Sequence, residues 1–253
     1  MTESRYEFVE EPDLEDPVLI EGLPGIGYVG KLAADHIIDE LEAEEFALMT
    51  SPYFPHHVTV DSNGILDLAK IRFYRAGVND RDLVIVGGDV QATSSEGHYE
   101  VTEKLLDIVE NLGIESLYSL GGYATGKHTD SEPTVVGAAN DEGLLEKYKE
   151  LGIEIEEGTG PILGVSGLLL GLGVKRGIEG TAFLGETHGM LVDHRSAQKV
   201  LETLANVLGF DIDMEELKKR AEKTEQIINR LQKEQKIRNI GGPGKDEDLS
   251  YIG

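Results

Sequence analysis

Residues 22–30 read Gly-Leu-Pro-Gly-Ile-Gly-Tyr-Val-Gly, and they stand between an apolar run and a stretch of helical periodicity. The run before them, Pro-Val-Leu-Ile at residues 17–20, is typical of a short buried strand. In residues 28–42 the apolar side chains recur three and four positions apart, which predicts a helix with one apolar face. Strand, glycine loop and helix in this order favour an α/β fold.

The same glycines match the dinucleotide-binding pattern G-x-G-x-x-G from Gly25 to Gly30. A nicotinamide site of this kind also needs an acidic residue about 20 positions later, at the end of the second strand. The second strand is expected at residues 46–50 and runs into Ser-Pro-Tyr, while Glu44 and Glu45 precede it. We therefore interpret the glycines as residues that permit a sharp turn and close packing of helix on strand.

The rest of the chain continues the alternation of strands and helices. Strands are expected at residues 57–60, 65–74, 82–87, 116–120, 134–138 and 180–185, and helices at 97–112, 142–151 and 196–208. Residues 162–172 are ambiguous, and their glycines and leucines suit a tightly packed buried helix near a loop. Asn63-Gly64 between two extended runs is a strong signal for a hairpin turn, and an antiparallel hairpin within this pattern indicates a mixed sheet.

Three parts follow from this pattern: an α/β core domain at 1–212, a C-terminal helix at 213–240 and a flexible tail at 241–253. Asp213 is expected to cap the helix, since Asp is a favoured N-cap residue. The spacing of the helix's apolar residues fits a modest coiled-coil seam. Packing against its own domain and self-association both remain open for this helix.

The composition is strongly acidic, with 48 Asp and Glu against 23 Lys and Arg and a formal net charge of −25. Such a surface repels phosphates and anionic lipids, which argues against nucleic-acid and membrane partners. An acidic shell around an ordered core suggests a salt-rich cytosol and a haloarchaeal source, because salt screens the self-repulsion. The acidic first residues argue against a signal peptide, and no run is long enough to span a bilayer, so a cytoplasmic protein is expected.

Several motifs come close to catalytic patterns without completing them. Residues 121–127 fit a phosphate loop up to Lys127, but His128 replaces the required hydroxyl residue. Residues 164–168 resemble a nucleophile elbow but lack its second glycine. The chain has no cysteine, and its histidines lack helical metal-ligand spacing, so neither a metal nor a cofactor is expected.

Loops after strand ends are nevertheless the natural ligand position in an α/β sheet. The residues of a possible glycine-lined cleft are Gly25, Gly27, Gly30, Gly122, Glu186 and His188.

The chain ends in a short peptide with apolar side chains, Asp-Leu-Ser-Tyr-Ile-Gly at residues 248–253. A glycine-rich segment at 241–244 separates it from the expected helix. Tyrosine supplies a large amphipathic contact area, and a free carboxylate pairs with a lysine or with backbone amides. We interpret the end of the chain as a docking peptide whose contact residues are Leu249, Tyr251, Ile252 and Gly253.

Four segments share their order and spacing with a known family. They are Gly22–Lys31, Gly121–Tyr123, Gly164–Gly173 and Phe183–Gly189. Together they resemble the archaeal proteasome assembly chaperone family over roughly residues 15–210, and the C-terminal helix and tail are similar to its PbaB-like members. The resemblance implies a three-layer α/β/α fold with a mixed sheet, like that of purine nucleoside phosphorylases.

The resemblance also implies homo-oligomerisation, a non-catalytic role and tails that dock between α subunits of the 20S proteasome. Proteasome activators end in a hydrophobic residue, a tyrosine and any last residue, whereas Tyr251 here is third from the end. The favoured hypothesis is a chaperone that binds 20S α subunits, with a related chaperone paralogue as a further candidate partner. The alternative is an enzyme that acts on a small anionic or nucleoside-like substrate.

Overall fold

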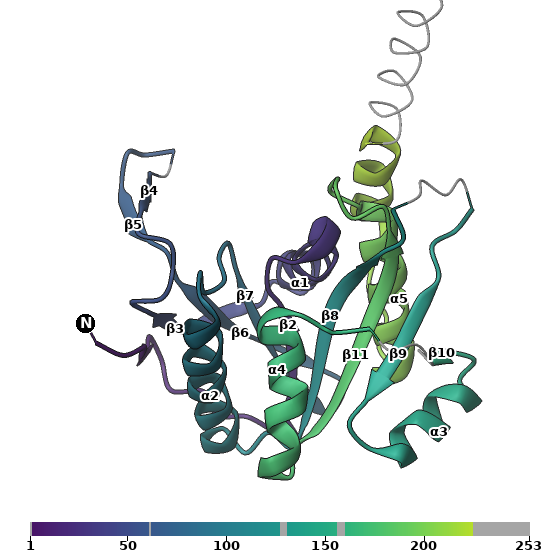
Figure 1. The fold of residues 1–253 in the computed structure, drawn as a ribbon, viewed down its shortest axis with the longest axis horizontal. Helices are drawn as coiled ribbons and strands as arrows, with labels where there is room; N and C mark the ends of the chain where they lie inside the picture. The colour runs from purple at the N-terminus through teal and green to yellow at the C-terminus, as the bar shows by residue number, and fades with distance from the viewer. Residues whose placement is uncertain (1, 61, 127–130, 156–159, 225–253) are drawn as a thin grey trace, which may run out of the picture.

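In the computed structural model, which describes residues 2–60, 62–126, 131–155 and 160–224, a mixed sheet lies between two layers of helices (Figure 1). The strands of this sheet are β1 (Arg5–Phe8), β2 (Val18–Gly22), β3 (Glu44–Thr50), β6 (Ile71–Val78), β7 (Arg81–Gly88), β8 (Ser116–Ala124), β9 (Val135–Ala139), β10 (Glu154–Ile155) and β11 (Glu179–Thr187). Their spatial order is β1-β3-β6-β7-β2-β8-β11-β9-β10.

The central strands run in one direction. β2 pairs in parallel with β7 and with β8, and β8 pairs in parallel with β11. The antiparallel pairs lie further out, where β6 joins β3 to β7 and β9 joins β11. The carboxyl ends of β2, β3, β7, β8 and β11 therefore share one edge of the sheet, which we call the carboxyl edge.

Two hydrophobic cores cover the two faces of the sheet. α2 (Ser95–Asn111) and α4 (Gly164–Gly173) lie side by side on one face, where they cover Leu19 and Val84. α1 (Val29–Glu40) and α5 (His194–Leu208) cover Ile20 and Leu83 on the other face, and α3 (Glu142–Glu150) packs near the β9 side. Alternate residues of each strand thus enter different cores, as the pleat of a sheet requires.

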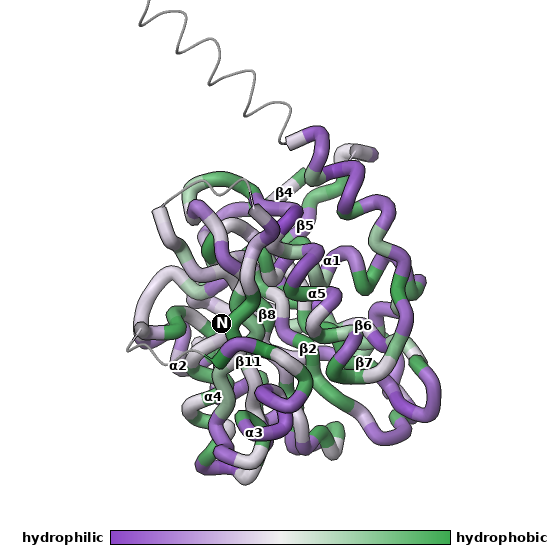
Figure 2. Tube along the Cα trace, turned by 90° about the vertical axis from the view of Figure 1, so that its right-hand side faces the viewer, coloured by the Kyte–Doolittle hydropathy of each residue, from purple (hydrophilic) through white to green (hydrophobic). Residues whose placement is uncertain are grey.

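This arrangement confirms the predicted three-layer α/β/α fold with a mixed sheet. Figure 2 shows hydrophobic segments through the centre of the molecule and hydrophilic ones mostly at its periphery. Within the described residues, no helix combines the length and the apolar character that crossing a bilayer requires. The likeness to phosphorylases stays a prediction.

The predicted hairpin forms, but it lies outside the main sheet. In the part of the chain that the structure describes, β4 (Val58–Val60) and β5 (Leu66–Leu68) pair only with each other, and the chain enters the main sheet at β6. The single strand expected at residues 65–74 is therefore wrong, because it is broken at Ala69 and Lys70. The antiparallel part of the sheet comes from β1, β3, β6, β7 and β9 instead.

Three further differences concern strands. β8 extends to Ala124 rather than ending at Leu120, because Gly121 and Gly122 pair with Leu184 and Gly185 of β11. The polar N-terminus supplies β1, whose Tyr6 ring lies 5.3 Å from that of Phe73. The two-residue strand β10 was too short to be recognised from periodicity.

Residues 215–224 are helical, and they pack on the domain that precedes them. Leu217 is buried in the core formed with α1 and α5, and Ala221 is also buried. The Asp213 carboxylate accepts a hydrogen bond from the Glu215 amide at 2.7 Å, as an N-terminal cap does. The remainder of the expected helix and the tail, residues 225–253, lie outside the described residues.

Candidate functional site

The glycine loop after β2 brings α1 into backbone contact with β8. Gly27 and Tyr28 both adopt the left-handed conformation, with φ of 63° and 56°, so the chain reverses sharply before α1. Gly30 then lies against β8, where an added Cβ would stand only 1.9 Å from the Leu120 carbonyl oxygen. A side chain at this position is therefore sterically impossible without moving α1.

Two other glycines of the predicted cleft are also packing positions. A Cβ on Gly122 would lie 2.6 Å from the Ile26 carbonyl oxygen, and one on Gly27 would lie 2.9 Å from the Thr187 hydroxyl. The space beside these glycines is thus already occupied by the neighbouring loop and by β11. Gly25 differs, since its nearest neighbour is the Leu23 carbonyl oxygen at 3.9 Å.

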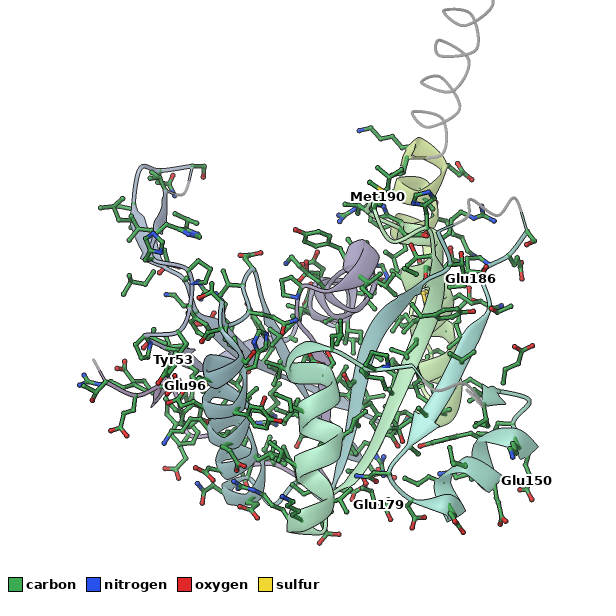
Figure 3. The ribbon with its side chains drawn as sticks, in the orientation of Figure 1. Tyr53, Glu96, Glu150, Glu179, Glu186 and Met190 are labelled. Atoms are coloured by element: carbon green, nitrogen blue, oxygen red, sulfur yellow. The ribbon has the colours of Figure 1, made fainter. Side chains whose placement is uncertain are left out.

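Glu186 and Thr187 are adjacent in β11 and therefore point to opposite faces of the sheet. Thr187 faces Gly27 and Gly122, whereas the Glu186 carboxylate accepts a hydrogen bond from the Thr134 hydroxyl at 3.3 Å. Figure 3 shows Glu186 near the upper end of β11. The structure thus gathers the predicted residues at the carboxyl edge but does not turn Glu186 toward the glycines.

His188 follows β11 directly and is partly buried. Its Nδ1 atom is enclosed and finds no hydrogen-bond partner among the residues that the structure describes. Among all the residues that the structure describes, no three His, Asp or Glu side chains are placed to share a metal ion.

Glu21 is a fully buried carboxylate that the sequence analysis missed. It occupies β2 directly before the glycine loop, where it accepts hydrogen bonds from the Ser119 hydroxyl at 2.6 Å and the Leu23 amide at 2.9 Å. Burial raises the pKa of Glu21, and the hydrogen bonds from Ser119, Leu23 and Ser166 oppose this shift. An acidic residue at the end of an apolar run was the signal that could have identified it.

The side-chain amide of Gln91 connects the glycine loop to α4. The Gln91 side chain donates to the Pro24 carbonyl oxygen at 2.6 Å and accepts from the Val165 amide at 3.1 Å. Because Glu21 contacts Ser166 of the same helix, two polar side chains join the loop to the start of α4. The loop is consequently held as part of the scaffold.

Apolar side chains are exposed where the glycine loop meets the loop after β11. The Asp193 amide donates to the Gly27 carbonyl oxygen at 3.0 Å, which holds the two loops together. Met190 is 84% exposed, and it projects at the upper end of the molecule in Figure 3. We call this surface the apolar rim; its exposed residues are Ile26, Tyr28, Met190, Leu191 and Val192.

An exposed cluster of this kind suits contact with another protein better than acid–base chemistry, because it offers apolar area without a paired acid and base. The predicted docking residues Leu249, Tyr251, Ile252 and Gly253 lie outside the described residues. They stay a prediction from the sequence.

The fold and the spacing of its glycine loops define a known class of protein. The model of the PAC2 family matches residues 19–232, and the chain belongs to this family. The resemblance stated from the sequence is thereby confirmed.

Individual relatives extend over almost the whole chain. PbaB of Pyrococcus furiosus, described as an archaeal proteasome activator, is 43% identical with a TM-score of 0.87, covering 92% of this chain and 100% of PbaB. PbaA of the same organism, described as an archaeal homologue of proteasome-assembly chaperone, is 28% identical with a TM-score of 0.74, covering 93% of this chain and 100% of PbaA. The uncharacterized protein MJ1210 of Methanocaldococcus jannaschii is 38% identical over 95% of this chain and 93% of its own.

Proposed function

We propose that this protein is a chaperone-like binding protein that associates with α subunits of the 20S proteasome. The observation that carries this proposal is the similarity to PbaB, which extends over 92% of this chain at 43% identity. The description of PbaA as a homologue of proteasome-assembly chaperone supports the same class of function.

The geometry of the carboxyl edge is consistent with binding rather than catalysis. Gly27, Gly30 and Gly122 are each explained by close packing, and Glu186 points away from them. The apolar rim offers exposed Met190 and Tyr28 to a partner. An enzyme that acts on a small anionic or nucleoside-like substrate has less support, because these residues do not converge.

Two surfaces are proposed to bind the α subunits: the apolar rim and the C-terminal peptide with Leu249, Tyr251, Ile252 and the Gly253 carboxylate. The peptide anchors the complex, and the rim adds apolar contact. We further propose that the working form is a cytoplasmic homo-oligomer.

A capture experiment with purified 20S α subunits in molar KCl tests both surfaces. The full chain is expected to bind, and a chain that ends at Asp248 is expected to bind at least about tenfold more weakly, since terminal anchors carry much of such affinity. Met190→Asp should also weaken capture, whereas Val174→Asp, at an exposed apolar position outside the rim, should not.

No capture by the full chain would refute the proposal. Equal capture by the full and shortened chains would refute the role of the peptide. Equal capture by Met190→Asp and Val174→Asp would refute the role of the rim.

A further inference from the structure

The hairpin of β4 and β5 has one apolar and one polar face. The pairs Val58–Leu68 and Val60–Leu66 stand on one side of this two-stranded ribbon, and the pair Thr59–Asp67 stands on the other. The ribbon stands apart from the main sheet at the upper left of Figure 1.

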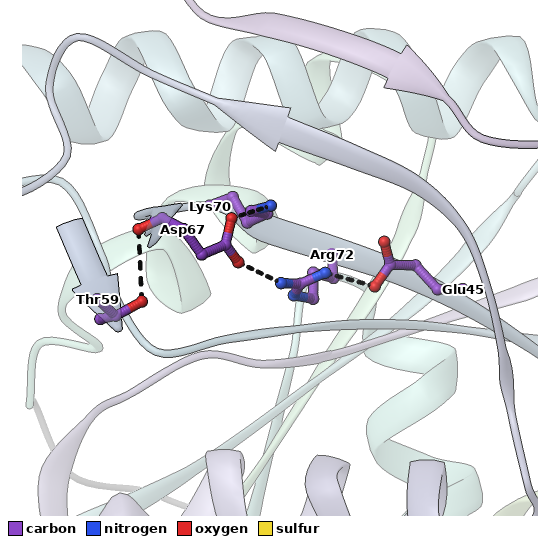
Figure 4. Close-up of polar contacts among 5 residues, drawn as sticks. All are labelled: Glu45, Thr59, Asp67, Lys70 and Arg72. Carbon is purple, nitrogen blue, oxygen red and sulfur yellow. Dashed lines mark hydrogen bonds and ion pairs between the residues drawn. The ribbon is translucent and has the colours of Figure 1, made fainter. Parts of the chain in front are cut away.

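Ion pairs hold the polar face to the body of the molecule (Figure 4). The Arg72 guanidinium contacts the Asp67 carboxylate at 2.8 Å and the Glu45 carboxylate at 2.6 Å, which links β5, β6 and β3. Lys70 adds a second cation 2.5 Å from Asp67. The hairpin therefore has a defined orientation, with its apolar face turned away from these contacts.

No residue that the structure describes covers the apolar face. Its four aliphatic side chains, Val58, Val60, Leu66 and Leu68, are between 48% and 65% exposed. An isolated two-stranded ribbon is marginally stable in water, and contiguous exposed apolar groups of this kind mark protein contact sites.

The base of the hairpin carries a pocket, and the apolar residues further along its strands are exposed. The pocket has a volume of about 510 Å³. Its lining is mostly apolar and consists of Pro52, Phe54, Pro55, Val58, Leu68 and Ala69, together with the polar Thr50, Ser51, His56 and His57. Val60 and Leu66 protrude further along the ribbon. One element thus carries both an apolar projection and an apolar recess, which is what a self-complementary interface requires.

The charge of this region differs from that of the whole chain. Residues 55–72 contain two acidic residues, Asp61 and Asp67, and two basic ones, Lys70 and Arg72, whereas the chain carries a net charge of −25. Two identical acidic molecules repel each other over most of their surfaces. A locally neutral, apolar segment is the place where they can meet at the lowest electrostatic cost.

Resting on the homo-oligomer proposed above, we propose that two copies of this chain make their contact through the β4–β5 hairpin, with two-fold symmetry. The ribbons lie antiparallel and face to face, so that Val60 and Leu66 of one copy enter the recess beside Val58 and Leu68 of the other. The contact forms without the proteasome, and its test is therefore independent of the capture experiment above.

Sedimentation velocity on the purified full chain in molar KCl tests the association. The double variant Val60→Asp, Leu66→Asp is expected to raise the self-dissociation constant by at least about a hundredfold, because four charges would be buried in the contact. Val174→Asp provides a control with similar exposure, at 54%, in the 3₁₀ turn η2 (Val174–Arg176). Circular dichroism and thermal melting establish that each variant folds.

Site-directed cross-linking checks the geometry, since the chain has no cysteine of its own. A mixture of Leu66→Cys and Val58→Cys chains should form disulfide-linked pairs faster than Val174→Cys chains do. A monomeric wild type, an unchanged mass for the double variant, or equal cross-linking of the control would each overturn the proposal. Loss of association in a chain that ends at Ile240, with no effect of the hairpin variant, would assign the contact to the tail instead.

Discussion

At the scale of single residues, the buried carboxyl group of Glu21 makes stability depend on pH. Burial raises its pKa in the folded protein above its value in the unfolded chain. The folded state therefore binds this proton more readily, so the contribution of Glu21 to stability is greatest below the unfolded pKa and falls as pH rises through the folded pKa.

Glu21→Gln keeps the shape and removes this titration. We compare the free energy of unfolding of the variant with that of the wild type. The variant's value minus the wild-type value should increase as pH rises above the ordinary pKa of glutamate, and it should level off above the raised pKa of Glu21 in the folded protein. Urea unfolding at a series of pH values measures this difference. The titration of the other carboxylates is the same in both proteins and therefore cancels in the difference. Parallel curves for the two proteins would contradict the assignment.

Glu21→Ala tests the hydrogen bonds instead of the charge. The truncation leaves the Ser119 hydroxyl and the Leu23 amide without their buried acceptor. We expect a loss of about 2 kcal/mol in the free energy of unfolding, given the cost of unsatisfied buried polar groups. Stability equal to that of Glu21→Gln would show that these bonds contribute nothing.

Two helical glycines form a matched pair at the same scale. Gly30→Ala places a Cβ 1.9 Å from the Leu120 carbonyl oxygen, while the Cβ of Gly171→Ala in α4 meets no described atom beyond its own helix within 4 Å. We expect Gly30→Ala to lose more than about 3 kcal/mol of stability by overpacking, and Gly171→Ala to gain about 0.5–1 kcal/mol from helix propensity. Thermal melting compares them, and equal effects would refute the packing role of Gly30.

At the scale of elements, Arg176 joins the turn after α4 to α2. Its guanidinium contacts three carboxylates of α2, those of Glu103, Asp107 and Glu110. These carboxylates are about half exposed, so solvent screening reduces the value of each pair.

Arg176→Ala should cost about 1–2 kcal/mol at low salt, because three like charges then remain together without their cation. The loss should shrink in molar KCl. Arg220→Ala is the control, since among the residues that the structure describes Arg220 pairs with Glu216 alone, at an exposed position, and the change should alter stability by less than about 0.5 kcal/mol. Chemical unfolding at two salt concentrations measures both variants; equal losses would refute the network.

The elements also show how far periodicity reaches. Runs of apolar residues correctly placed β2, β3, β7 and β11 and the helices α1 to α5. They missed β1, whose short sequence Arg-Tyr-Glu-Phe becomes a strand because Tyr6 and Phe8 pack on aromatic rings of β6 and β3. The apolar pattern also predicted β5 and β6 as one strand, because no local signal separates the exposed hairpin strand from the sheet strand that follows it in the chain.

At the scale of the whole molecule, the net charge of −25 makes salt a stabiliser. Compact folding brings like charges together, and KCl screens them. We expect the midpoint of urea unfolding to rise with the KCl concentration. Most of the rise should occur below roughly 1 M, because the Debye length has already fallen to about 3 Å at that concentration. An uncharged osmolyte at equal osmolality is the control, and a midpoint that does not change with KCl would contradict the expectation.

The sequence by itself determined the alternation of strands and helices, because it depends on apolar periodicity and on glycines whose spacing is local. The resemblance carried by four of its segments indicated the family and the three-layer fold with a mixed sheet, whereas the hairpin that first suggested a mixed sheet lies outside the main sheet. The sequence also singled out the residues of the carboxyl edge, such as Gly122 and Glu186. Only the tertiary structure decided what they do: β-strand alternation turns Glu186 away from the glycines, and backbone contacts fill the space beside them. The burial of Glu21 and the uncovered face of the hairpin likewise depend on which distant segments lie alongside, which no local pattern records.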